Sequence, residues 1–315
     1  MHFAPLFALF AQLAAVVFVE ALPVTLPELK AADILALKPY ASLAAITYCP
    51  INQIKQWTCA KCKDEPFDLI ASGGNGATVQ NWFVGWDKSL KKLIVAYEGT
   101  VPTAPASVIT DLKFTPKPLR RELFPDAPAD AMTHGGFGDA HAASAKDVLT
   151  AVKAGMGKYK TKSITVVGHS LGAGIAIIES GQLAAQIPRA NIETIAFSSP
   201  RVGNPAFAKY VSSRANLKIT RINNMSDPVP ELPGRTLLKS PNNFVHVGQE
   251  IHITSEGKYI KCPTESENPQ CTNGYLITMT DLESLKSFQE LFAHPKKLWN
   301  PLQHQGPFAG ISIFC

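Results

Sequence analysis

The stretch SITVVGHSLGAGIAII, residues 163–178, contains a Gly-His-Ser-Leu-Gly pattern between two apolar segments. β-branched residues dominate 163–167 and predict a strand, and the alanine- and isoleucine-rich residues from Ser170 predict a helix. The pattern Gly-x-Ser-x-Gly alone arises by chance in about one chain in ten of this length. The flanks make it specific, because a nucleophilic serine on a sharp strand-to-helix turn needs small neighbours such as Gly168 and Gly172. We therefore expect Ser170 to be a nucleophile at such a turn.

Strand and helix patterns alternate along the chain on both sides of this turn. We expect strands at 79–85, 91–98, 163–167, 192–198 and 217–222, and helices at 31–48, 139–159, 170–187, 204–213 and 281–293. This alternation predicts an α/β fold with a mostly parallel central sheet covered by helices on both faces. No internal repeat or low-complexity linker divides the sequence, so we expect a single domain.

The overall composition excludes several classes of protein. Hydrophobic residues make up 46% of the chain and charged residues 17%, which suits a globule with a sizeable core. The formal net charge of +5 is spread over isolated pairs such as Lys91-Lys92, so nucleic-acid binding is not expected. No set of cysteines and histidines has the spacing of a zinc site. We expect no metal, no cofactor and no stable protein partner, and hence a monomer.

The first twenty residues, MHFAPLFALFAQLAAVVFVE, are almost uncharged and are followed by small residues and a proline. An apolar segment of this kind is typical of a secretory signal, although a basic start is missing. We expect a signal peptide at 1–21, cleavage near Ala21, and a secreted mature domain at 22–315. A membrane anchor is the alternative, because the apolar run approaches the length of a spanning helix.

Six cysteines in a chain with a secretory signal suggest three disulfides, for which 15 pairings exist. Proximity suggests two of them and leaves a third: Cys59 with Cys62, Cys262 with Cys271, and Cys49 with Cys315. The alternative for Cys59-x-x-Cys62 is a thioredoxin-like redox site. Its neighbours, which include Trp57 and Pro66, do not provide the expected strand and helix, so a structural disulfide is favoured.

A serine nucleophile needs a histidine base and a carboxylate that orients the histidine. In this class of fold the chain order is serine, then carboxylate, then histidine. Asp227 lies just beyond the strand expected at 217–222, in the sequence Asp-Pro-Val-Pro, and is our candidate. Glu231 is the alternative carboxylate.

Four histidines follow Asp227 along the chain: His246, His252, His294 and His304. The first two fall in or beside expected short strands, where a structural role is usual. His294 follows the helix expected at 281–293. His304 lies eleven residues before Cys315, so a disulfide at Cys315 would hold its loop firmly.

Together these residues resemble a secreted fungal class 3 lipase, and most of all the mono- and diacylglycerol lipases of Malassezia-type yeasts. The resemblance covers nearly all of the mature chain and rests on motifs in a fixed order: Tyr48-Cys49, Glu98-Gly99-Thr100, His134-Gly135-Gly136-Phe137, Gly168-His169-Ser170-Leu171-Gly172-Ala173, Ser199-Pro200-Arg201-Val202-Gly203-Asn204, Asp227-Pro228-Val229-Pro230, and His304-Gln305-Gly306-Pro307-Phe308 before the terminal cysteine.

The resemblance implies an α/β-hydrolase fold and a catalytic triad of Ser170, Asp227 and His304. It also implies an oxyanion hole formed by the backbone N–H groups of Leu171 and Thr100. Asp227 and His304 are 77 residues apart, longer than is usual in the family, which keeps His294 as an alternative base.

The same resemblance implies an apolar lid over the active site, and the segment VPTAPASVITDLK at 101–113 stands at its position. Such a lid would open at a lipid–water interface. The implied activity is hydrolysis of acylglycerol esters through an acyl-enzyme intermediate. The alternatives are a feruloyl or aryl esterase of the same fold and an inactive esterase-like binding protein. The glycosylation sequon Asn224-Met225-Ser226 adjoins Asp227, and we expect it to be buried and unmodified.

Overall fold

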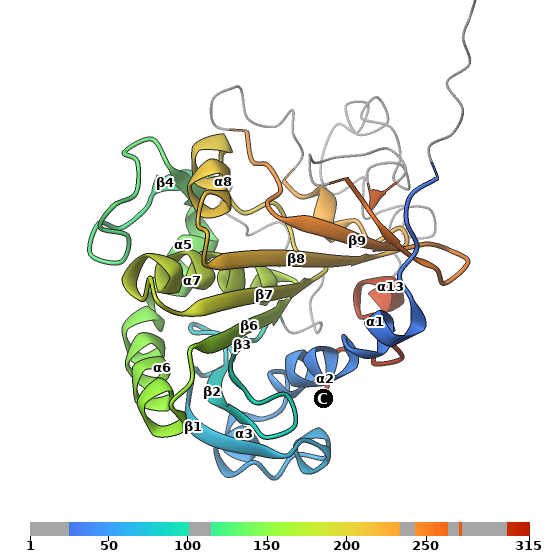
Figure 1. Ribbon diagram of the computed structural model, residues 1–315, viewed down its shortest axis with the longest axis horizontal. Helices are drawn as coiled ribbons and strands as arrows, with labels where there is room; N and C mark the ends of the chain where they lie inside the picture. The colour runs from blue at the N-terminus through green and yellow to red at the C-terminus, as the bar shows by residue number, and fades with distance from the viewer. Residues whose placement is uncertain (1–24, 101–114, 234–242, 264–270, 273–300) are drawn as a thin grey trace, which may run out of the picture.

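The fold is built on an eight-stranded sheet, shown in Figure 1. The computed structural model describes residues 25–100, 115–233, 243–263, 271–272 and 301–315. In spatial order the strands are β1 (Phe67–Gly73), β2 (Trp82–Asp87), β3 (Lys92–Tyr97), β6 (Ser163–His169), β7 (Asn191–Phe197), β8 (Leu217–Asn224), β9 (Gln249–Ile253) and β10 (Tyr259–Lys261). The five strands from β3 to β9 in this order are parallel, and the outer strands β1, β2 and β10 are antiparallel to their neighbours. The sheet therefore has the mostly parallel order that the alternating pattern predicts.

Helices cover both faces of the sheet (Figure 1). One face carries α1 (Ala31–Leu35), α2 (Lys38–Ile46), α3 (Ile51–Gln56) and the C-terminal α13 (Pro301–His304). The other carries α5 (Gly135–Ala142), α6 (Ala145–Tyr159), α7 (Leu171–Gln186) and α8 (Pro205–Ser212). Two 3-10 turns, Lys61–Asp64 and Val229–Glu231, and a small antiparallel pair, β4 (Pro116–Pro118) with β5 (Met132–His134), complete the described elements.

Alternating side chains of the central strands fill a separate core on each face. On β3, Ile94 and Ala96 join the core under α2 and α3, whereas Leu93 and Val95 join the core under α6 and α7. This alternation is the two-residue period of a strand that is covered on both sides. Helix α7 is buried on all sides: every residue from Gly172 to Ala184 is buried, including the polar Glu179, Ser180 and Gln182.

The observed elements differ from the expected ones in several places, and the helix expected at 31–48 is two helices, α1 and α2. Strand β1 is absent from the expectations, because its sequence FDLIASG does not alternate cleanly and it pairs only with β2. Strand β2 begins at Trp82, three residues later than expected. The helix expected at 139–159 is two helices, and the first begins at Gly135 because the Nδ1 atom of His134 accepts a hydrogen bond from the Phe137 N–H and caps it.

The six cysteines form the disulfides Cys49–Cys315, Cys59–Cys62 and Cys262–Cys271. The expected signal peptide at 1–21, the expected lid at 101–113, the expected helix at 281–293 and His294 lie outside the described residues. In the part of the chain that is described, no helix is both long and apolar enough to span a membrane.

The carboxyl ends of the parallel strands bring distant residues together. Glu98 and Thr100 follow β3, Ser170 follows β6, and Asp227 lies just beyond β8. Parallel strands end at the same edge of a sheet, which is where open α/β sheets place their ligands. The candidate site therefore lies at this edge.

Candidate active site

Ser170 occupies a strained turn between β6 and α7. Its backbone angles are φ 58° and ψ −128°, which a residue with a side chain rarely adopts. The Ser170 N–H donates to the carbonyl oxygen of Phe197 at 3.0 Å, which fixes the turn to the neighbouring strand. Strain of this kind is the mark of a nucleophile elbow.

The two glycines beside this turn allow an unusually close approach of backbone segments. A Cβ atom at position 168 would lie 2.1 Å from the carbonyl oxygen of Gly172, and one at position 172 would lie 2.4 Å from that of Tyr97. Real Cβ atoms do not approach other atoms so closely. The glycine at each position is therefore required by the packing of α7 against β6 and β3.

Asp227 is 1% exposed and lies in a tight loop after β8. Its backbone N–H donates to the Asn224 carbonyl oxygen at 3.0 Å, and its Oδ1 atom accepts from the Val229 N–H at 3.0 Å. The buried Arg201 side chain holds the far end of the loop through hydrogen bonds to Glu231 and to the carbonyl oxygen of Pro233. Glu231, the alternative carboxylate, thus forms an ion pair with Arg201 at 2.7 Å.

The imidazole of His304 lies beside the Asp227 carboxylate. Its Nδ1 atom is 2.9 Å from Oδ2 and 3.1 Å from Oδ1, so an Nδ1–H donates to the carboxylate. Such a bond leaves Nε2 as the proton acceptor of the neutral ring. His246 instead contacts the carbonyl oxygen of Pro230, and His252 is fully buried near Glu250.

Two side chains from distant strands hold the backbone around His304. The Asn224 amide donates to the carbonyl oxygen of Gln303 at 2.8 Å, and the His169 Nε2 atom lies 2.7 Å from the carbonyl oxygen of His304. Our sequence reasoning missed both roles. The position of His169 inside the serine motif was the available signal for one of them.

Asn224 is also the acceptor residue of the only glycosylation sequon. It is 1% exposed, as expected, and its amide nitrogen is engaged with the backbone of Gln303. A glycan on this nitrogen is incompatible with that contact, which supports the expectation that Asn224 is unmodified. The expectation stays a prediction.

The two candidate oxyanion donors belong to the two chain segments that meet at the Ser170 turn. Leu171 is the first residue of α7, and the N–H groups in the first turn of a helix have no acceptor within that helix. Thr100 follows Gly99 at the end of β3. A Cβ atom at Gly99 would lie 2.5 Å from the His169 carbonyl oxygen and 3.0 Å from the Ser170 Cβ atom, so this chain segment touches the turn directly.

Glu98 and His169, which lie near the turn, have displaced pKa values. Burial raises the pKa of the Glu98 carboxyl to about 7, although hydrogen bonds from Asn81 oppose this shift. Burial, together with the neighbouring His304, lowers the pKa of the His169 imidazole to about 3. His169 is therefore neutral at physiological pH.

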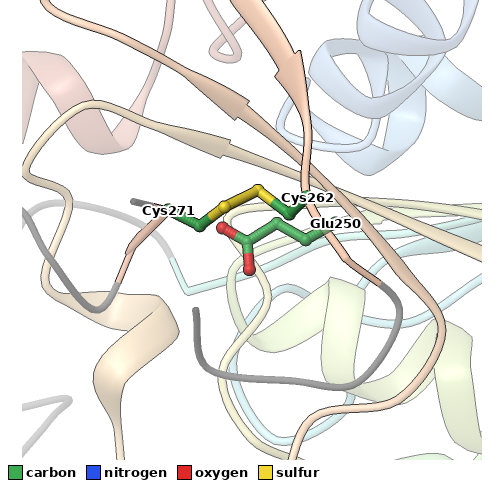
Figure 2. Close-up of side chains that lie close together, drawn as sticks. All are labelled: Glu250, Cys262 and Cys271. Atoms are coloured by element: carbon green, nitrogen blue, oxygen red, sulfur yellow. A yellow bond between two sulfur atoms is a disulfide. The ribbon is translucent and has the colours of Figure 1, made fainter. Parts of the chain in front are cut away.

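Glu250 and the Cys262–Cys271 disulfide form a separate buried cluster, shown in Figure 2. Both sulfur atoms are bonded to each other, so neither is a thiolate ligand for a metal ion. Burial opposes ionisation of Glu250, but Arg221 and the Thr272 hydroxyl outweigh it and lower the pKa of the carboxyl. The cluster therefore joins β8 and β9 to the Cys271 segment and is structural.

A strained serine turn at the carboxyl edge of a mostly parallel sheet defines the chain as an α/β-hydrolase. The profile of the class 3 lipases, "Lipase (class 3)", matches residues 94–237. This match places residues 94–237 in the class 3 lipase family.

Similar proteins include fungal lipases. A lipase of Rhizopus niveus is 28% identical over 273 residues, which cover 82% of this chain and 64% of that protein. A secreted mono- and diacylglycerol lipase of Malassezia globosa is 30% identical over 208 residues, which cover 66% of each protein. The chain thus spans slightly less than two thirds of the length of these two relatives.

Solved structures of lipases share the fold. Lipase from Rhizopus microsporus var. chinensis has a TM-score of 0.73 at 26% identity, over 90% of each chain. Lipase II from Rhizopus niveus has a TM-score of 0.73 at 24% identity, over 91% of this chain and 98% of that one.

Proposed function

We propose that this protein is a secreted serine ester hydrolase that cleaves acylglycerols, with Ser170, Asp227 and His304 as its catalytic triad. The single observation that carries the proposal is the hydrogen bond of His304 to the buried Asp227, beside the strained Ser170 turn. A surface turn needs neither a strained serine nor an aspartate–histidine pair. Catalysis by a serine nucleophile needs both.

In the proposed reaction, the Ser170 Oγ attacks the ester carbonyl carbon while the His304 Nε2 atom accepts its proton. Asp227 stabilises the resulting imidazolium, and the N–H groups of Leu171 and Thr100 stabilise the oxyanion. The imidazolium then protonates the alcohol that leaves, and Ser170 carries the acyl group. Water activated by His304 attacks this acyl-enzyme, which releases the fatty acid and restores the serine.

Acylglycerols are favoured as substrates by the names of the relatives. The Rhizopus proteins are lipases, and the proteins of Malassezia globosa and Gibberella zeae are secreted mono- and diacylglycerol lipases. The apolar segment at 101–113 agrees with a substrate that has long acyl chains. We therefore propose mono- and diacylglycerols as the main substrates at a lipid–water interface.

The decisive test is a panel of a monoacylglycerol, a diacylglycerol, a triacylglycerol and methyl ferulate, with the Ser170→Ala variant as control. We expect release of fatty acid from the acylglycerols by the natural protein and none by the variant. Preferential hydrolysis of methyl ferulate would identify an aryl esterase instead. Failure of the natural protein on every ester, with no covalent labelling of Ser170 by an organophosphate, would identify a non-catalytic protein.

The assignment of the base is tested by comparing His304→Ala with His294→Ala. We expect His304→Ala to lose about 10³-fold or more in kcat, because the proton acceptor of the serine is removed. His294→Ala is expected to retain activity. Full activity of His304→Ala contradicts the assignment.

A further inference from the structure

The side chains of Tyr48 and His169 form two consecutive hydrogen bonds that end on the backbone of His304. The hydroxyl oxygen of Tyr48 is 2.6 Å from the Nδ1 atom of His169, and the Nε2 atom of His169 is 2.7 Å from the carbonyl oxygen of His304. These bonds span 121 and 135 residues of sequence, so only the folded chain brings the three groups together.

The chemistry of the groups determines the direction of both bonds. A carbonyl oxygen can only accept, so the Nε2 atom of His169 must carry the hydrogen and donate it. The Nδ1 atom of the neutral ring is then an acceptor, and the Tyr48 hydroxyl must donate to it. The bonds therefore run from Tyr48 to His169 and from His169 to His304.

The surroundings keep both groups in these protonation states. His169 is 2% exposed, and burial holds the pKa of its imidazole at about 3, with His304 adding to this effect and Asp227 opposing it. Burial and the nearby Glu98 carboxyl raise the pKa of the Tyr48 hydroxyl well above its ordinary value. Neither group changes charge near neutral pH.

Tyr48 also touches the chain segment that carries the candidate oxyanion donor. A Cβ atom at Gly99 would lie only 2.2 Å from the Tyr48 hydroxyl oxygen, so this hydroxyl packs directly against the residue before Thr100. The next residue along the chain, Cys49, is bonded to Cys315 of the segment that follows His304. Tyr48 therefore contacts the end of β3 and the serine turn, and its neighbour Cys49 is bonded to the C-terminal segment.

We propose that Tyr48 and His169 are positioning residues, which together hold the backbone of His304 in register with the Ser170 turn. His169 acts through the His304 carbonyl and not on the substrate, and Tyr48 acts by locking the ring of His169 in the tautomer that donates. This inference rests on the proposed triad. It adds a role for a histidine inside the serine motif and for a tyrosine more than one hundred residues away.

The first test removes only the tyrosine hydroxyl, in Tyr48→Phe, and compares it with Tyr210→Phe. Tyr210 is a suitable control because its buried side chain also donates to a side chain, Asp126 at 2.6 Å, from α8 on the other face of the sheet. With a soluble short-chain ester, we expect Tyr48→Phe to lower kcat about 10- to 100-fold with KM within about twofold. Tyr210→Phe is expected to lower Tm comparably without changing kcat. A Tyr48→Phe variant with the kcat of the natural protein overturns the proposal.

The second test changes the histidine. His169→Gln retains an N–H donor that can reach the His304 carbonyl, whereas His169→Leu removes it. We expect kcat to fall in the order natural protein, His169→Gln, His169→Leu. We also expect Tyr48→Phe to cause little further loss when combined with His169→Leu, because both changes break the same connection. Independent, multiplicative losses would contradict the proposal.

A third measurement does not depend on activity. The side-chain ¹⁵N signals of His169 should report a neutral ring with hydrogen on Nε2 between about pH 5 and 8, and a mixture of tautomers in Tyr48→Phe. A His169 ring that becomes charged in this range in the natural protein overturns the proposal. Inactivity of the natural protein towards all esters would refute the proposed function instead, so the two failures are distinguishable.

Discussion

At the scale of single residues, Glu98 shows how burial near the site affects stability. Its side chain is 2% exposed at the end of β3 and accepts a hydrogen bond from the Asn81 N–H at 2.9 Å. Burial disfavours the charged form, so the pKa of the carboxyl is about 7 in the folded protein against 4.5 for an unperturbed glutamate. The folded protein therefore binds this proton more tightly than the unfolded chain does.

We predict that Glu98 makes the protein less stable as the pH rises from about 4.5 to about 7, because over this range the unfolded chain releases the proton before the folded protein does. Glu98→Gln cannot ionise, so its free energy of unfolding should decline less over this range, by up to a few kcal/mol at about 1.4 kcal/mol per pKa unit. Urea unfolding at several pH values measures this. Glu256→Gln is the control, because the Glu256 side chain is 72% exposed. Identical pH profiles for Glu98→Gln and the natural protein would count against the assignment.

At the scale of elements, the packing of α7 against β3 depends on a glycine. A side chain at position 172 would meet the carbonyl oxygens of Tyr97 and Glu98 at 2.4 and 2.6 Å. Both are backbone atoms and cannot move aside as the end of a flexible side chain can. The first turn of α7 can therefore lie this close to the end of β3 only with a glycine at position 172.

We predict that Gly172→Ala lowers the free energy of unfolding by about 1–3 kcal/mol or more and displaces the serine turn. Gly157→Ala is a matched control in α6, where an added Cβ meets nothing within 4 Å. That exposed helical substitution should stabilise the protein by about 0.5–1 kcal/mol. Urea unfolding and ester hydrolysis measure both effects, and a Gly172→Ala variant as stable and active as the natural protein would disprove the prediction.

At the scale of the whole molecule, the Cys49–Cys315 disulfide closes almost the entire described chain into a loop. Its cysteines are 266 residues apart, whereas those of Cys59–Cys62 are three apart. The long loop restricts the unfolded chain far more than the short one. The same disulfide also anchors the segment that follows His304.

We predict that replacing Cys49 and Cys315 with serine lowers the free energy of unfolding by about 2–5 kcal/mol, and the Cys59 and Cys62 pair by less. The first variant should also lose more kcat, because the C-terminal segment that carries His304 is released at its end. Urea unfolding and short-chain ester kinetics compare the two variants. Equal losses in both would mean that the long disulfide has no special role.

Much of the architecture follows from local sequence patterns. The β-branched run before Ser170, the small residues beside it and the alternating strands and helices predict the parallel sheet and the turn, because these depend on neighbours along the chain. Strand β1 and the break between α5 and α6 were not predicted. Strand β1 depends on its pairing with β2, a contact between two strands that the pattern of β1 alone does not reveal.

The features of the candidate site can also be separated into those that follow from the sequence and those that depend on tertiary contacts. The sequence by itself determined the serine turn and an even set of cysteines, since both follow from residue types and spacing. It left the carboxylate open between Asp227 and Glu231, and only a resemblance favoured His304 over His294 as the base. Only the tertiary structure decided that Glu231 pairs with Arg201, that His304 and not His246 or His252 reaches Asp227, and that Tyr48 contacts His169. Hydrogen bonds act over about 3 Å, and the distance between these groups becomes that short only when the sheet has brought distant strand ends to one edge.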